Sequence, residues 1–283
     1  MNKRIIKKVL QKKHEDFLLS IKDEAVKQLV KNNSIITGGS IASMLLGEKP
    51  NDYDYYFTDL ATVIAVTNYY VKGFIIAHPE LKKPVVKVQD ERVRIFIKSS
   101  GIAGRQDEEG DQPVEDPVED EKKAKYRPVS LTNNAISLSN SVQLVIRFYG
   151  SAEEIHSNYD YIHCTNYWES KTGKLTFHQA ALESLLSKHL YYSGSKYPLC
   201  SVVRMRKFLK RGWHINAGQI LKMCMQISEL DLLDVAVLED QLTGVDTAYF
   251  TELINSLKTK QESDPNFRVT TPYIANIVDK LFG

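Results

Sequence analysis

The 283-residue chain has an ordinary globular composition, with 43% hydrophobic and 25% charged residues, which excludes wholesale disorder. It shows no run of about 18 apolar residues, and charges interrupt its N-terminus throughout, which argues against a membrane span and a signal peptide. Its three cysteines lack C-x-x-C spacing, which argues against a disulfide framework or a zinc site and favours a reducing cytoplasm.

Charge is distributed unevenly along the chain. Residues 101–127 hold nine acids and five bases and almost no large apolar groups. Such a segment cannot bury enough surface to offset its ordering entropy, so a disordered acidic insertion is predicted at about 99–127. The remaining residues carry 32 bases against 26 acids, a balance that suits a polyanionic partner such as a nucleotide or nucleic acid.

Helix and strand patterns alternate through the first part of the chain. Apolar residues at spacings of three and four over 4–31 predict one or two amphipathic helices. A β-branched strand at 34–37 meets a glycine pair that opens a helix at 40–47. The elements predicted next are a strand at 52–58, a helix capped by Asp59, strands at 84–89, 92–99, 134–139 and 142–150, a helix at 151–157 and a strand at 159–168.

Helical patterns dominate the remainder, with helices predicted at 176–192, 201–213, 217–227, 247–258 and 272–282. The expected fold class is therefore α+β, a mixed sheet with flanking helices followed by a helical C-terminal domain. The predicted domains are N-terminal helices at 1–33, an α/β domain at 34–173 that contains the acidic insertion, and a helical domain at 174–283.

The stretch "ITGGSIASMLLGEKPNDYDYYF" combines a glycine turn with two alternating aspartates. Side chains alternate along a strand, so Asp52 and Asp54 are expected on one face, about 7 Å apart, where they would repel unless a cation lay between them. Mg²⁺ prefers such hard oxygen ligands together with substrate phosphates. Backbone N–H groups at Gly38, Gly39 and Ser40, at the start of a helix, are expected to face those phosphates.

The glycine-serine turn followed by the D-x-D strand resembles the signature of the DNA polymerase beta superfamily of nucleotidyltransferases. That resemblance implies a nucleotidyltransferase-fold sheet, a third carboxylate on a neighbouring strand, two metal ions, and in-line attack on the α-phosphate of a nucleoside triphosphate. Residues 159–175 are similar to the tRNA nucleotidyltransferase and poly(A) polymerase branch. On that match Asp160 is the third carboxylate, and Asn166 and the Thr172-Gly173 turn follow it.

Residues 204–215 resemble the arginine-rich helix of the same branch, which carries over the nucleotide-binding bases Arg204, Lys207, Lys210 and Arg211. The whole pattern, from Ser34 to Ile215, also looks like short proteins encoded by bacteriophages. Two departures stand out. Asn158 and Tyr159 replace the two arginines of the branch, and no acid before Val202 matches its nucleotide-selecting motif.

Simpler explanations exist for the less specific residues. Asp160 could be an aspartate that bonds local backbone at a strand end, and Asp90 and Glu91 compete with it as third acids, although they fall at a hairpin tip. The bases between 204 and 211 could be the solvated side of an amphipathic helix.

These observations predict a metal-dependent nucleotidyltransferase that moves NMP from an NTP such as ATP to an acceptor hydroxyl. Asp52, Asp54 and Asp160 would be its catalytic residues and would hold two Mg²⁺ ions, for which Mn²⁺ could substitute. The expected acceptor is a tRNA-like RNA 3′ end in the cytoplasm, that of the host if the chain is phage-encoded. A protein hydroxyl or a small molecule is the alternative acceptor, and the alternative function is a non-catalytic module that binds nucleic acid or protein.

Overall fold

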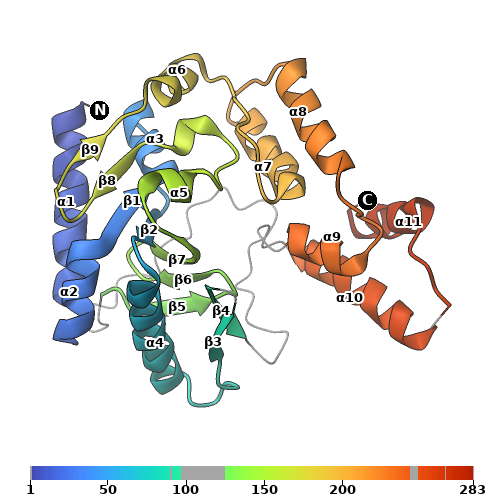
Figure 1. Cartoon of the computed structure of the whole chain (residues 1–283), viewed down its shortest axis with the longest axis horizontal. Helices are drawn as coiled ribbons and strands as arrows, with labels where there is room; N and C mark the ends of the chain where they lie inside the picture. Colours follow the sequence, from blue (N-terminus) through green and yellow to red (C-terminus); the bar gives the residue numbers. More distant parts are fainter. Residues whose placement is uncertain (1, 90, 97–124, 243–247, 265, 283) are drawn as a thin grey trace. The chain divides into compact units, whose positions relative to one another are not determined.

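The computed structural model describes residues 2–89, 91–96, 125–242, 248–264 and 266–282. Contacts divide these residues into two units, the first ending at Ser187 and the second beginning at Lys188 (Figure 1). The predicted division before residue 174 lies one helix earlier. The difference arises because the helix that follows, α6 (Gln179–Ser187), is joined to the first unit, where the His178 N–H donates to Asn166 Oδ1 at 2.9 Å.

The first unit is built on a seven-stranded mixed sheet of order β5-β6-β7-β2-β1-β8-β9. In the centre, β2 runs antiparallel to β1 and parallel to β7. The strands are β1 (Ser34–Thr37), β2 (Tyr53–Phe57), β5 (Pro128–Leu131), β6 (Ala135–Leu138), β7 (Val142–Tyr149), β8 (Tyr167–Glu169) and β9 (Leu175–Thr176), and β3 (Val85–Gln89) with β4 (Arg92–Phe96) forms a separate hairpin. The mixed sheet, its flanking helices and the helical second unit confirm the predicted α+β class.

Four helices of the first unit begin at side-chain caps that the sequence supplies. Asp59, predicted as the cap of α4, accepts the Thr62 N–H at 2.8 Å, and Asn2 and Asp23 cap the first two helices in the same way. Ser151 and Glu154 form a capping box. Besides α6, the helices are α1 (Lys3–Ser20), α2 (Glu24–Asn33), α3 (Gly39–Leu46), α4 (Leu60–Ala77) and α5 (Ala152–His156).

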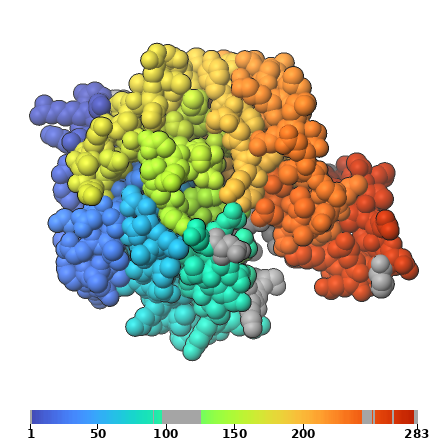
Figure 2. Space-filling view, in the orientation of Figure 1, coloured from blue at the N-terminus to red at the C-terminus, as the bar shows by residue number. Residues whose placement is uncertain are grey.

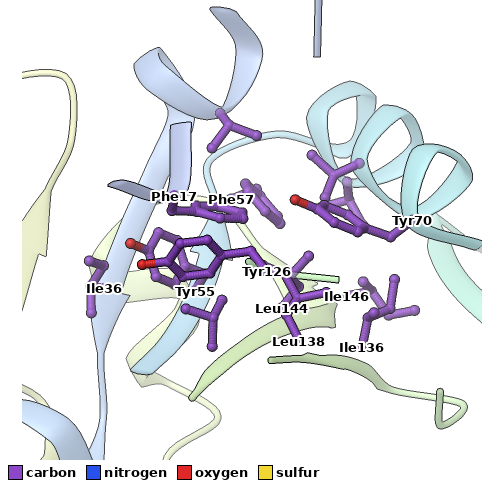
Figure 3. Packing of buried hydrophobic residues seen from close by; sticks show 14 of the residues in the cluster. Phe17, Ile36, Tyr55, Phe57, Tyr70, Tyr126, Ile136, Leu138, Leu144 and Ile146 are labelled. Carbon is purple, nitrogen blue, oxygen red and sulfur yellow. The ribbon is translucent and has the colours of Figure 1, made fainter. Parts of the chain in front are cut away.

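Residues from distant parts of the sequence form the main core of this unit. Side chains from α1, α2, α3 and α4 pack on the sheet face that carries Ile36, Tyr55 and Leu144. Phe17 is central, with ring centroids 5.0 Å from Tyr55 and 5.5 Å from Tyr126 (Figure 3). The N-terminal helices are therefore part of the sheet unit, and blue, green and yellow segments share its surface (Figure 2).

Helix α4 is long and apolar enough to cross a membrane by length and composition, with a mean hydropathy of 1.5 over 18 residues. No other helix in the described ranges meets that test. One side of α4 is buried in the main core through Val63, Val66, Tyr70, Val71 and Phe74. A core helix passes the same test, so this feature is weak evidence of a membrane span.

His14 lies inside the core, with its ring 5.9 Å from that of Tyr55 and 5.2 Å from that of Trp168. It is 5% exposed, neither ring nitrogen has a hydrogen-bond partner within the described residues, and burial lowers its pKa to about 4. An unfolded chain protonates this ring near pH 6.5, whereas the folded chain does so only near pH 4. Acid therefore favours unfolding.

We expect the shifted titration of His14 to lower the free energy of unfolding by on the order of 3 kcal/mol as the pH falls from about 6.5 to about 4, with little further change below pH 4. His14→Phe keeps an aromatic ring and removes the titration, so it should flatten that part of the stability curve. Urea unfolding at about pH 7 and about pH 5 measures the change. His78→Phe, at a partly exposed ring, is the control, and an equal flattening there would contradict the assignment.

The second unit is helical, as predicted, and has its own core of Val235, Leu238, Leu242, Leu253 and Leu257. Trp213, 5% exposed, is buried in this unit after α7. Its helices are α7 (Pro198–Lys210), α8 (Ala217–Ser228), α9 (Val235–Leu242), α10 (Ala248–Ser263) and α11 (Thr271–Phe282), of which α9 has no counterpart among the predicted elements.

Two predicted segments differ from the structure. The strand predicted at 159–168 is largely a turn with a short 3-10 helix, η1 (Ile162–Cys164), because the Thr165 hydroxyl donates to the Ile162 carbonyl at 2.8 Å and closes the chain locally. Most of the predicted acidic insertion, 99–124, lies outside the described residues. Its last residues, 125–127, are described, and Tyr126 packs in the main core at 5% exposure, so the predicted boundary at 127 was too late in the sequence.

Candidate active site

The glycine turn after β1 lies against the carboxylate of Asp54. Gly38 has φ +85° and ψ −150°, a conformation that favours glycine, and its N–H donates to the Cys164 carbonyl of η1 at 3.1 Å. A Cβ at Gly38 would lie 2.7 Å from Asp54 Oδ2. The two motifs that the sequence places about a dozen residues apart therefore meet in space.

The three residues of the turn do not contribute equally. The Gly38 N–H is already bonded to Cys164, so it is not available to a phosphate. Gly39 begins α3, is exposed, and has nothing within 4 Å of the position that a Cβ would take. Ser40 is 1% exposed, and its hydroxyl has no hydrogen-bond partner within the described part of the chain. The open side of this helix N-terminus is therefore at Gly39.

The aspartates differ in their surroundings. Asp54 is half-buried in β2, on the sheet face opposite Tyr55 and the main core, whereas Asp52 precedes the strand and is exposed. Burial, and secondly the negative charge of Asp52, raise the pKa of Asp54 well above its usual value. The fold thus holds a carboxylate where its own charge is unfavourable. A divalent cation would relieve that cost, so the residues present fit a hard cation at Asp52 and Asp54.

Tyr159 lies beside Asp54, where the resemblance would have an arginine. Its hydroxyl would be 3.5 Å from a Cβ at Gly38. Burial first, then the neighbouring Tyr56 and Asp54, raise the pKa of Tyr159 well above 10. The preceding residue, Asn158, bonds to the Glu154 carbonyl at 2.9 Å and closes α5. Neither residue supplies the positive charge of the expected arginine pair.

Asp160, predicted as the third carboxylate, lies outside the two strands that flank β2, and its role as a metal ligand stays a prediction. It is 8% exposed and lies in the bend before η1, whereas the strands that flank β2 are β1 and β7. Over the ranges that the structure describes, no three His, Cys, Asp or Glu side chains form a group that could hold a metal. The predicted strand that would have carried Asp160 along the sheet is instead the turn closed by Thr165.

The later motif residues stabilise the same region. The Thr37 hydroxyl donates to the Asn166 carbonyl at 3.0 Å, and Asn166 is 1% exposed. Gly173, at φ +61°, and Thr172, whose hydroxyl donates to Glu169 Oε2 at 3.0 Å, form the predicted turn between β8 and β9. The Asn166 carbonyl thus holds the end of β1, and the Thr172-Gly173 turn joins the last two strands of the sheet.

The last residue of α5, His156, contacts the end of β1. His156 Nε2 lies 2.8 Å from the Thr37 hydroxyl, and Thr37 pairs with Asp54 across the strands. The Thr37 hydroxyl also lies 3.0 Å from the Asn166 carbonyl and 3.3 Å from the Cys164 carbonyl, and donation to either carbonyl lets it accept a hydrogen bond from His156 Nε2. Burial, then His178, lowers the pKa of His156 to about 4, so the ring is neutral at pH 7. No local motif identifies this contact, because its partners are 119 residues apart.

We expect Thr37→Val to destabilise the fold by about 1–3 kcal/mol, because it leaves the His156 N–H and a buried carbonyl without their partner. Urea unfolding measures the loss. Thr58→Val is the matched control, since Thr58 is exposed just after β2. Equal stability of the two variants would contradict a structural role for the Thr37 hydroxyl.

The predicted nucleotide-binding bases belong to the second unit. Lys207 and Lys210 are exposed near the end of α7, Arg204 is half-buried, and Arg211 follows the helix. The turn after them contains Gly212 at φ +76°, as the Gly-aromatic pattern predicts. Their role toward a nucleotide stays a prediction.

Three comparisons with known proteins add to this geometry. Residues 8–188 match the family described as Gabija anti-defense 2 family protein. A curated relative, "Gabija anti-defense 2" of Bacillus phage SPbetaL7, is 21% identical over 257 residues, which cover 90% of this chain and 52% of the relative. The chain therefore spans about half the length of the curated relative that it matches.

Among solved structures, the Thermotoga maritima CCA-adding enzyme complexed with tRNA is 12% identical, with a TM-score of 0.40, over 91% of this chain and 57% of that one. A tRNA nucleotidyltransferase with a primer tRNA and an ATP analogue is 14% identical, with a TM-score of 0.35, over 86% and 62%. Scores this low do not establish a common fold. The family match, by contrast, covers well over half of the sequence, and the chain belongs to the Gabija anti-defense 2 family.

Proposed function

We propose that this chain is a metal-dependent nucleotidyltransferase that serves the anti-defense role for which its family is described. One observation carries the proposal, the approach of the glycine turn to Asp54, which leaves no room for a Cβ at Gly38. A carboxylate of raised pKa beside an open helix N-terminus suits a cation and a polyphosphate bound next to each other.

The residues have separate tasks in this proposal. Asp52 and Asp54 would hold Mg²⁺, which when bound neutralises phosphate charge and lowers the pKa of an attacking hydroxyl. The free N–H groups at the start of α3 would hold the outer phosphates of an NTP, on the open side at Gly39. His156 and Thr37 would keep the end of β1, and with it the turn, in position. The exposed bases of α7 would add positive charge to the second unit, which suits a polyanionic acceptor.

An RNA 3′ end is the acceptor that we favour, because the basic balance of the chain suits a polyanion. The test is incubation with each α-labelled NTP, Mg²⁺ and total RNA, and in a parallel reaction with protein from cells that carry Gabija. Label on RNA supports the proposal, and label on protein would replace its acceptor. Absence of label from both, with an Asp52→Asn/Asp54→Asn protein as the blank, would contradict nucleotidyl transfer.

A non-catalytic binding module is the second candidate. Two observations favour it: the described residues contain no group of three metal-binding side chains, and Tyr159 stands where an arginine is expected. Calorimetry separates the two candidates. Mg²⁺-dependent binding of NTP supports the enzyme, whereas metal-independent, strongly salt-sensitive binding of RNA without turnover supports the module.

A further inference from the structure

We infer that the carboxylate pair binds one divalent cation rather than two, and that Gln143 occupies the position from which a third carboxylate would bind the second. The inference rests on the proposed function, because it concerns the metal site assigned there to Asp52 and Asp54. The strand register fixes the neighbours of Asp54 on both sides.

Asp54 pairs with Thr37 on β1 and with Gln143 on β7. Register partners present their side chains on the same face of a sheet, and neighbouring strands lie about 4.8 Å apart. These two positions are therefore the closest in the sheet from which another side chain could reach an ion bound to Asp54. Both carry neutral residues.

Thr37 is not available to an ion. It is fully buried, its hydroxyl donates to a backbone carbonyl, and His156 lies 2.8 Å away on the same oxygen. Gln143 differs, because it is half-buried and its amide makes no hydrogen bond with the rest of the described chain. Of the two neighbours, the amide of Gln143 is the group that can turn toward a ligand.

The register partners of Asp54 form a row across the sheet, and this row remains neutral beyond β7. Gln143 pairs with Ser137 on β6, and Ser137 pairs with Ser130 on β5. Across five strands, Asp54 is thus the charged member of a row whose other members carry hydroxyl or amide groups. Asp160, the sequence-based candidate for a third acid, does not form a group with Asp52 and Asp54 anywhere in the described ranges.

Charge then decides the number of ions. Two carboxylates balance the charge of one divalent cation. A second divalent cation, about 3.5–4 Å from the first, would leave two uncompensated positive charges in a half-buried site. An amide oxygen can bind a cation but does not neutralise it. A carboxylate at Gln143 would supply negative charge at about the distance that the second ion requires.

The experiment counts Mn²⁺ ions per chain, without nucleotide, by calorimetry and by the loss of the free Mn²⁺ resonance. We expect one ion in the natural chain and two in Gln143→Glu, which changes an amide to a carboxylate of the same shape. The matched control is Gln89→Glu, because Gln89 is exposed at the end of β3 in the separate hairpin, and it should bind one ion.

Two bound ions in the natural chain would overturn the inference and leave the proposed function intact. One ion in Gln143→Glu would overturn the role given to Gln143. No bound ion in the natural chain would instead remove the metal site, and with it both the inference and the proposed function. Gln143→Asp replaces Gln143→Glu if circular dichroism shows that the longer carboxylate prevents folding, and the count in the natural chain still decides the first point.

Discussion

Replacing Asp54 with asparagine is expected to stabilise the metal-free protein while it abolishes nucleotidyl transfer. The stabilising effect follows from the raised pKa of Asp54, which shows that the fold disfavours its charged form. In the unfolded chain the carboxyl group ionises near pH 4, so its charge costs folding free energy as the pH rises above that value. Asparagine keeps the shape and removes the charge.

The loss of transfer should be large, because a metal-binding carboxylate acts directly on the charge that develops during phosphoryl transfer. We expect a reduction of about a thousandfold or more, about 4 kcal/mol in barrier height. Stability should rise by on the order of 1 kcal/mol, measured as urea unfolding at about pH 7, and the gain should vanish below about pH 4.

The control is Asp16→Asn, the same change at an exposed site on α1. It should alter neither the rate of nucleotidyl transfer nor the stability noticeably. Mg²⁺ gives a second criterion, since it should raise the thermal midpoint of the natural chain but not that of Asp54→Asn. If Asp54→Asn lost stability at neutral pH, the unfavourable burial of this carboxylate would be contradicted.

Alanine at Gly38 is expected to disrupt the site and alanine at Gly39 to preserve the fold, although the two glycines are adjacent in sequence. At Gly38 the new Cβ would lie 2.7 Å from Asp54 Oδ2. The alanine would also have to adopt the φ of +85° that glycine has there. Backbone strain of this kind costs about 1–3 kcal/mol, and Asp54 would also have to move. At Gly39 the helical backbone accepts alanine, which should stabilise α3 by up to about 1 kcal/mol.

Urea unfolding compares the two variants in metal-free buffer, where the expected changes have opposite signs. Titration with Mn²⁺ then tests the site, and Gly38→Ala should bind the ion at least tenfold more weakly, because its ligand Asp54 is displaced. Equal stability of the two variants would contradict the close approach of the turn to Asp54.

The elements that sequence patterns located well are those fixed by local interactions. The strand at 34–37 begins and ends where it was predicted, and Asp59 caps α4, because β-branching and a capping side chain act within a few residues. The Gly38–Asp54 approach was also within reach, since β1 and β2 are consecutive strands separated only by α3, and consecutive strands are usually neighbours.

The features of the site that sequence patterns did not locate depend on contacts between residues far apart in the sequence. Gln143 lies beside Asp54 because β2 and β7 are parallel neighbours, which no local pattern records. The strand predicted around Asp160 was wrong for the opposite reason, since alternating residues from 159 to 168 imitate a strand while the Thr165 hydroxyl closes a turn. His156 reaches Thr37 only once α5 is folded onto the sheet.

The burial of the two tryptophans, Trp168 in the first unit and Trp213 in the second, gives each half of the chain its own optical reporter. Trp168→Phe would leave fluorescence that follows the helical half alone, and Trp213→Phe would leave emission from the sheet half. Because the imidazole of His14 touches the edge of the Trp168 ring, that second signal should also dim in acid as the imidazole gains its proton. A single spectrometer can thus distinguish whether the halves melt together or one after the other.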